Sequence, residues 1–244
     1  MTLPSPPLLE ELFAQGPLAL FLDFDGTLVE LAPTPDAIAP RDGLAGALGE
    51  LSERLGGACA IVSGRALDDI AHHVGGTLPV AGAGSHGADV RDAGGAPLGA
   101  APGALPPAIE TAMRSFAETE ELGFEVKPHG AALHYRENPA KAEAAHAFAD
   151  QLAADHGWVT QSGKCVVELV EGRADKGSAV RTFMGAEPFA GARPIFIGDD
   201  LTDEKGFAAC ADMGGFGILV GERANTAAQH QLPNVASVHR WLGL

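Results

Sequence analysis

Two aspartates directly after a short apolar run form a candidate site for chemistry. The run Leu18–Leu22 is apolar throughout and leads into Asp23-Phe24-Asp25-Gly26-Thr27. A continuous apolar stretch of this length is typical of a buried parallel strand. Residues two apart along an extended chain share a side, so Asp23 and Asp25 can present paired carboxylates to one site. Gly26 allows a sharp turn and the close approach of a ligand to the backbone. A pair of acids that only solvate a turn is the alternative.

Two further polar clusters could hold an anion. Ser63-Gly64-Arg65 follows a second apolar run, 58–62, and precedes a predicted helix, so a hydroxyl and backbone N–H groups meet at a helix N-terminus. Asp175-Lys176-Gly177 places a compact cation at the start of another predicted helix. A helix cap at Ser63 and a solvated first turn at Lys176 would explain the same residues.

A dense group of acids follows a third apolar run, 194–198. Asp199, Asp200, Asp203 and Glu204 place four acids within six residues. Such acids repel one another and destabilise the fold by several kcal/mol if they are buried and unpaired. A hard divalent cation would remove that repulsion, and ligands that are all oxygen suit Mg²⁺. Helix capping by Asp200 or Asp203 would explain part of the group.

The elements that must position these clusters predict an open α/β sheet, since short apolar strands alternate with helices over short connections. Open α/β sheets bind their ligands at strand ends, which is where all four clusters lie. Between 105 and 172 the pattern changes to helix, strand, strand, helix, strand, which predicts an inserted α+β module. The fold expected is a three-layer, Rossmann-like α/β core over 1–104 and 173–244, with an α+β cap over 105–172. The Gly/Ala/Pro-rich segment 82–107 is interpreted as turns and a connection.

Composition and charge limit the possible partners and compartments. With 46% apolar and 20% charged residues the chain has the composition of a globular protein. The formal net charge of -16 argues against nucleic acid or an anionic membrane as a partner. The longest apolar runs are too short to span a bilayer, and the N-terminus does not resemble a signal peptide. The scattered cysteines Cys59, Cys165 and Cys210 have no metal-ligand spacing, so we predict a cytoplasmic protein.

The order of the four clusters resembles the haloacid-dehalogenase (HAD) superfamily of phosphotransferases. The matching residues are Asp23-Phe24-Asp25-Gly26-Thr27-Leu28, Ser63, Lys176, and Asp199 with Asp200 and Asp203. The resemblance implies that Asp23 attacks phosphorus and becomes an aspartyl phosphate. Asp25 would protonate the departing oxygen and then deprotonate water. Ser63 and Lys176 would hold the transferring phosphoryl oxygens.

The resemblance also implies a Mg²⁺ ion. Asp23, the main-chain carbonyl of Asp25, and Asp199 would bind it, and the ion would offset charge between the nucleophile and the phosphate. Asp200 and Asp203 would lie just outside these ligands. Of the two, Asp203 is expected to orient metal-bound water.

The inserted module carries polar residues that could bind a sugar. Glu125 and Lys127 are two apart on a strand-like piece, Arg136 ends the next piece, and Lys164 and Glu168 share one side of the last strand. Lys, Glu and Arg together can donate to and accept from several hydroxyl groups. An exposed sheet face with weak salt bridges would contain the same residue types.

These residues extend the resemblance, over roughly 18–221, to the trehalose-6-phosphate phosphatases. It rests on the following motifs: Ser63-Gly64-Arg65, Gly84-Ser85-His86-Gly87, Glu125-x-Lys127, His134-Tyr135-Arg136, Gly163-Lys164-x-x-x-Glu168, Asp175-Lys176-Gly177, and the run Gly198–Glu204. The resemblance implies that Glu125, Lys127, Arg136, Lys164 and Glu168 contact the disaccharide and that Arg65 lies by the phosphate.

The resemblance implies Mg²⁺-dependent hydrolysis of trehalose 6-phosphate, in trehalose biosynthesis. Phosphatases of sucrose 6-phosphate or mannosyl-3-phosphoglycerate share the core motifs and are the nearest alternatives. A non-catalytic sugar-phosphate-binding module and a phosphotransferase with another acceptor are alternatives of other classes. The expected partner is a small sugar phosphate; whether a trehalose-phosphate synthase also binds cannot be judged from these residues.

Overall fold

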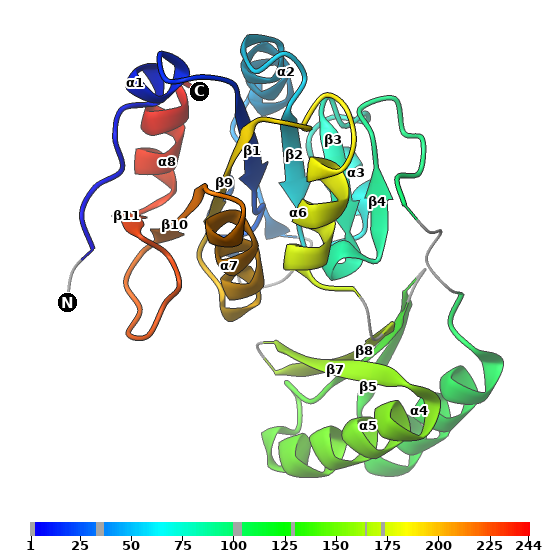
Figure 1. The fold of residues 1–244 in the computed structure, drawn as a ribbon. Helices are drawn as coiled ribbons and strands as arrows, with labels where there is room; N and C mark the ends of the chain where they lie inside the picture. The colour runs from blue at the N-terminus through cyan, green and yellow to red at the C-terminus, as the bar shows by residue number, and fades with distance from the viewer. Residues whose placement is uncertain (1–2, 33–36, 100–103, 128–129, 164, 172–173) are drawn as a thin grey trace. The chain divides into compact units, whose positions relative to one another are not determined.

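The described residues of the computed structural model (3–32, 37–99, 104–127, 130–163, 165–171 and 174–244) belong to two compact units. Residues 1–100 together with 175–244 make the first unit, and residues 101–174 make the second. Figure 1 shows the ribbon of both. No helix among the described residues is both long enough and apolar enough to cross a membrane.

A seven-stranded sheet forms the centre of the first unit, in the order β11-β10-β9-β1-β2-β3-β4. Every neighbouring pair is parallel except β3 with β4. Since β1 lies between β2 and β9, residues that follow these three strands emerge side by side at one edge. The strands are β1 (Leu18–Leu22), β2 (Cys59–Val62), β3 (Ala81–Gly84), β4 (Asp89–Arg91), β9 (Arg193–Gly198), β10 (Phe216–Val220) and β11 (His230–Leu232).

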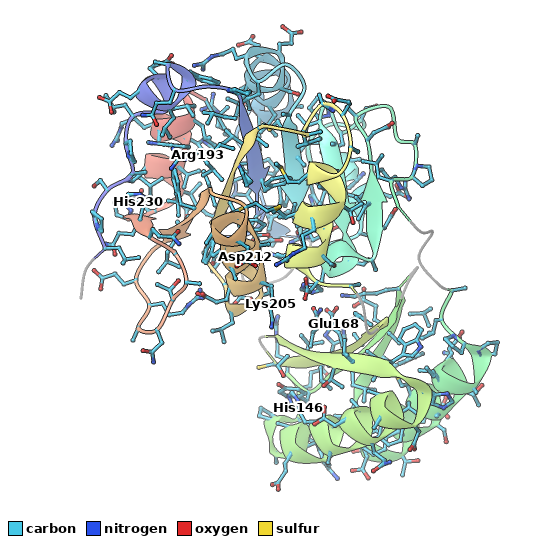
Figure 2. All side chains as sticks on the ribbon, in the orientation of Figure 1. His146, Glu168, Arg193, Lys205, Asp212 and His230 are labelled. Atoms are coloured by element: carbon cyan, nitrogen blue, oxygen red, sulfur yellow. The ribbon has the colours of Figure 1, made fainter. Side chains whose placement is uncertain are left out.

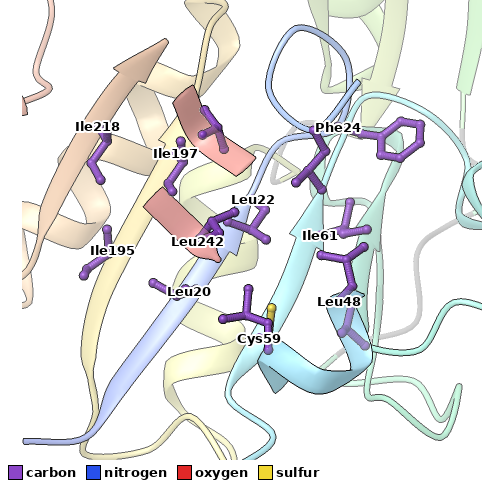
Figure 3. Packing of buried hydrophobic residues seen from close by; sticks show 14 of the residues in the cluster. Leu20, Leu22, Phe24, Leu48, Cys59, Ile61, Ile195, Ile197, Ile218 and Leu242 are labelled. Carbon is purple, nitrogen blue, oxygen red and sulfur yellow. The ribbon is translucent and has the colours of Figure 1, made fainter. Parts of the chain in front are cut away.

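Helices cover both faces of this sheet because its central strands are apolar on both sides. On one face Leu20 and Leu22 of β1 pack with residues of α1, α2, α3 and α8, including Leu48 and Leu242 (Figure 3). On the other face Phe21 packs with residues of α6 and α7. The helices are α1 (Leu9–Phe13), α2 (Leu44–Arg54), α3 (Leu67–His73), α6 (Lys176–Met184), α7 (Glu204–Asp212) and α8 (Val235–Leu242), with short 3-10 helices η2 (Ser85–Gly87) and η4 (Leu201–Asp203).

The second unit is a four-stranded antiparallel sheet with two helices on one face (Figure 1). Leu133 and Leu169 point from the sheet into an apolar layer, where Met113 and Ala149 of the two helices meet them. The opposite face of the sheet carries the alternate side chains, among them Glu125 and Glu168. Its elements are α4 (Pro107–Glu120), β5 (Gly123–Lys127), β6 (Gly130–His134), the 3-10 helix η3 (Pro139–Lys141), α5 (Ala142–His156), β7 (Trp158–Gly163) and β8 (Val166–Glu171), in the sheet order β5-β6-β8-β7.

The predicted fold class, a layered α/β core with an α+β insertion, is confirmed, but four strands were not foreseen: β3, β4, β7 and β11, the last only three residues long. β3 lies in a Gly/Ala-rich segment that was interpreted as turns and a connection. Its small residues are needed because a Cβ on Gly82 would lie 2.7 Å from a Leu67 methyl group, so close packing overrides low strand propensity. β4 follows it as a short antiparallel edge strand. β7 is a largely polar, half-exposed edge strand, so no apolar run marks it.

Candidate active site

The four polar clusters of the first unit converge at one edge of its sheet. Asp23 and Asp25 follow β1, Ser63 and Arg65 follow β2, and Asp199 follows β9. Lys176 is the first residue of α6, which begins with a capping box formed by Asp175 and Ser178. Convergence at the carboxyl ends of parallel strands is the usual position of ligand sites in this class of sheet.

A buried lysine joins two of the aspartates. The Lys176 ammonium lies 2.8 Å from Asp23 Oδ1 and 2.6 Å from Asp203 Oδ1, and all three side chains are nearly inaccessible to solvent. Burial alone would lower the pKa of Lys176, but the charges of Asp203 and Asp23 outweigh it and raise that pKa. Lys176 therefore remains a cation at physiological pH, and it orients the Asp23 carboxylate.

Each of the four acids after β9 has a different environment. Asp203 is fully buried, binds Lys176 and accepts from the backbone N–H of Asp200 at 2.8 Å. Glu204 lies 2.8 Å from the Arg223 guanidinium, and the Asp200 side chain accepts from the Leu201 N–H at 2.7 Å. Asp203 and Asp200 thus make the reciprocal contacts of a capping box.

Asp199 is the acid of this group that retains capacity for a ligand. Among the described residues its Oδ1 is buried and has no hydrogen-bond partner. Burial, followed by the charge of Asp203, raises the pKa of Asp199 to about 7. Burial, followed by the same charge, raises the pKa of Asp23 well above its usual value. Such shifts indicate a concentration of negative charge that a cation would relieve.

The geometry of this cluster fits a metal ion. Three carboxylate oxygens, one from each of Asp23, Asp199 and Asp203, lie within 4.8 Å of one another. Gly26 leaves room beside them, because a Cβ at that position would lie 2.2 Å from Asp199 Oδ2. Oxygen donors that are ionised and clustered in this way suit a hard divalent cation.

Asp25 is held by a bidentate pair with Arg65. The guanidinium Nε lies 2.6 Å from Asp25 Oδ2, and Nη2 lies 2.8 Å from Asp25 Oδ1. The same guanidinium donates from Nη1 to Asp69 Oδ2 of α3 at 2.8 Å. The arginine that is expected beside the phosphate therefore contacts the predicted acid and base, Asp25, directly.

Ser63 is buried, and the segment after β3 fixes its main chain. Its N–H donates to the Ala83 carbonyl at 2.9 Å, and its own carbonyl accepts from the His86 N–H at 2.9 Å. The Ser85 N–H donates to the Arg65 carbonyl at 2.8 Å. Ser85 and His86 both have positive φ, of 49° and 57°, which is unusual for side-chain-bearing residues. This tight turn brings backbone groups close enough to support the Ser63 loop.

Polar residues of the second unit lie on the sheet face opposite its helices, where Figure 2 shows Glu168 pointing away from α5. Lys127 Nζ is 2.5 Å from Glu168 Oε1, and both side chains are largely buried. Glu125 and Ala132 are paired across β5 and β6, and Ala132 pairs with Glu168 of β8, so these residues form one cross-strand row. A hydrogen bond from His134 at 2.9 Å lowers the pKa of Glu125.

Arg136 and Lys164 are the remaining predicted sugar-binding residues. Arg136 lies two residues after the end of β6, and it is exposed. Lys164 lies outside the described residues.

Comparison with known proteins identifies the family. Residues 21–234 match the sequence model of the family described as Trehalose-phosphatase. The chain belongs to the trehalose-phosphatase family. A probable trehalose-phosphate phosphatase of Sinorhizobium fredii is 42% identical over 83% of this chain and 77% of its own length. The trehalose-6-phosphate phosphatase of Escherichia coli is 36% identical over 97% of this chain and 89% of its own length.

Solved structures agree with this placement. A trehalose-6-phosphate phosphatase related protein is 25% identical, with a TM-score of 0.68 over 92% of this chain and 95% of its own. A haloacid dehalogenase-like hydrolase from B. subtilis is 14% identical, with a TM-score of 0.68 over 93% of this chain and 99% of its own, and it supports the fold alone.

Two residues of this trehalose-phosphatase family member were not anticipated at the site. Asp69 contacts the Arg65 guanidinium from α3, and only its i, i+4 spacing could have indicated the contact. Arg223 lies in the segment after β10 and binds the loop that carries Asp199. The apolar run of β10 ends three residues before Arg223 and is the one signal that could have marked it, but the contact itself depends on the order of strands in the sheet.

Proposed function

We propose that this chain hydrolyses trehalose 6-phosphate to trehalose and inorganic phosphate, with Mg²⁺ as cofactor and through an aspartyl-phosphate intermediate. The observation that carries the proposal is the buried Lys176, which bridges Asp23 and Asp203 where β1 and β9 end. A nucleophile oriented by a fixed cation is the arrangement that phosphoryl transfer to a carboxylate requires. The substrate is inferred from relatives whose names specify it.

In the first step the Asp23 carboxylate attacks phosphorus and the bond from phosphorus to the sugar oxygen breaks. Asp25 gives a proton to the departing oxygen, and the Arg65 guanidinium holds Asp25 in place beforehand. In the second step water attacks the aspartyl phosphate while Asp25 takes a proton from it. The bond from phosphorus to Asp23 then breaks, which releases phosphate, restores the Asp23 carboxylate and leaves Asp25 protonated for the next cycle. Ser63 and Lys176 hold the phosphoryl oxygens through both steps.

Asp23, Asp199 and the main-chain carbonyl of Asp25 would hold Mg²⁺, as the clustered oxygens and the buried Asp199 Oδ1 suggest. When bound, the ion offsets negative charge between the nucleophile and the phosphate. Asp203 stays on Lys176, and with Asp200 it keeps the ligand loop in shape.

We propose that the second unit, predicted at 105–172, recognises the sugar. Glu125, Lys127 and Glu168 share one polar face, and this face offers donors and acceptors for hydroxyl groups. Arg136 and Lys164 are proposed to complete the set. All three cysteines are free, which suits the reducing cytoplasm that we propose as the compartment.

The test measures phosphate release, with Mg²⁺, from trehalose 6-phosphate, glucose 6-phosphate and sucrose 6-phosphate. We expect trehalose 6-phosphate to be strongly preferred. Asp23→Asn should reduce its turnover at least about a thousandfold, since the nucleophile is lost. Asp212→Asn, the same change at an exposed ion pair of α7, is the matched control and should leave turnover unchanged.

Each other outcome is informative. Preference for sucrose 6-phosphate, lost in Asp23→Asn, would keep the mechanism and overturn the substrate. Turnover that survives Asp23→Asn would overturn the mechanism. No release from any of the three compounds would contradict the proposed activity and favour a binding module.

A further inference from the structure

Arg223 makes an unusual set of contacts with the loop that carries Asp199. Its Nη1 donates to the Asp200 carbonyl at 3.0 Å and to Glu204 Oε1 at 2.8 Å, while Nη2 donates to the Asp199 carbonyl. Glu204 Oε2 in turn accepts from the Ala227 N–H at 2.7 Å. One guanidinium therefore ties the segment after β10 to two consecutive carbonyl groups after β9 and to the first turn of α7.

The Asp199 carboxylate has little else to fix its direction. Its Oδ1 is buried without a hydrogen-bond partner among the described residues, whereas Asp203 is anchored by Lys176. The direction of the Asp199 side chain therefore depends mainly on its main chain. That main chain is held by a planar donor group, which fixes orientation better than a single ammonium would.

We infer that Arg223 is a positioning residue: by holding the carbonyl groups of Asp199 and Asp200, it keeps the Asp199 carboxylate beside Asp23 and ready for a divalent cation. The inference rests on the proposed Mg²⁺ site. Residues that orient metal ligands in this way typically change metal affinity about 10–100-fold when they are removed.

An electrostatic role and a positioning role of Arg223 predict opposite changes in the affinity for Mg²⁺ when this residue is substituted. Arg223 is a cation close to the acidic cluster, so by charge alone Arg223→Met should remove repulsion and tighten the binding of Mg²⁺. If Arg223 acts by positioning, the same change frees the Asp199 main chain and weakens the binding. The direction of the change in affinity therefore distinguishes the two roles.

The experiment titrates Mg²⁺ alone against the melting temperature of the full chain, which reports binding without any turnover. For Arg223→Met we expect the apparent Kd for Mg²⁺ to rise about tenfold, and for Arg223→Lys an intermediate rise. Arg193→Met is the matched control. Arg193 also donates to a main-chain carbonyl, that of Gly214 at 3.2 Å, but it lies at the start of β9, at the opposite end of that strand from Asp199 (Figure 2).

An unchanged or lower Kd in Arg223→Met would overturn the inference while leaving the metal site intact. An equal rise in Arg193→Met would also overturn it, because the effect would then be general destabilisation. If Arg223→Met does not fold, Arg223→Lys decides: a Kd equal to that of the unmodified chain overturns the inference. If the unmodified chain itself shows no response to Mg²⁺, the proposed metal site fails first and the inference falls with it.

Discussion

Asp199→Asn should make the metal-free protein more stable while it removes the response to Mg²⁺. The pKa of Asp199 is raised from 3.8 to about 7, chiefly by burial and then by Asp203, so folding favours its protonated form. The folded-state penalty is therefore absent below about pH 4 and complete above about pH 7. A neutral asparagine of the same shape carries no such penalty.

The size of the expected stabilisation follows from the shift in the pKa of Asp199. About three pKa units at 1.36 kcal/mol each give roughly 4 kcal/mol as an upper limit. Asp199 is not completely buried, and solvent screens part of its charge, so we expect a gain of about 1–2 kcal/mol. For a protein of this size that is a rise in melting temperature of about 2–8 °C.

The assay is thermal unfolding followed by circular dichroism, at about pH 5 and about pH 8, with a chelator or with Mg²⁺. Without metal, the difference between Asp199→Asn and the unmodified chain should be larger at the higher pH. With Mg²⁺ the unmodified chain should gain stability and the variant should not. A variant that melts below the unmodified chain at the higher pH without metal would refute the reasoning.

Three further outcomes are expected. Lys176→Met should lower the free energy of unfolding by about 3 kcal/mol, and by more at high pH, because two buried carboxylates lose their cation; denaturant unfolding measures this. Arg65→Lys should lower kcat/KM for trehalose 6-phosphate about tenfold, since bidentate support of Asp25 is lost. An aryl phosphate, whose leaving group needs no proton, should show a smaller loss, and equal losses would contradict the assigned role. Glu168→Gln should raise KM for trehalose 6-phosphate about tenfold, whereas Glu120→Gln, at a similar Lys–Glu pair with a 2.5 Å contact, should not.

Strand ends could be located from the sequence because buried parallel strands are short continuous apolar runs. The runs before Asp23 and Asp199 carry that signal, and β1 and β9 lie where it places them. Strands at the edge of a sheet, or packed closely against bulky side chains, carry no such signal. The edge strands β4, β7 and β11 are short or polar, and β3 has small residues because Leu67 and Leu78 pack onto it.

Pairwise contacts at the site could not be predicted in the same way. The divalent cation was expected to relieve the repulsion among the acids after β9, but the fold itself neutralises two of them. Lys176 pairs with Asp203, and Arg223 pairs with Glu204 from a segment whose nearness depends on β10 lying beside β9. The pairing of Arg65 with Asp25 likewise depends on β1 and β2 being neighbours.

These pairings bear on how a chain with a net charge of -16 could bind a phosphorylated substrate. The described cations around the site are already engaged: Lys176 by two aspartates, Arg65 by Asp25 and Asp69, and Arg223 by Glu204. Their charge is largely offset locally, so they orient carboxylates more than they attract a dianion. Attraction for the phosphate must then come mainly from a cation added beside Asp199. Asp199, the acid that destabilises the metal-free fold, is therefore also the residue that makes phosphate binding depend on the metal.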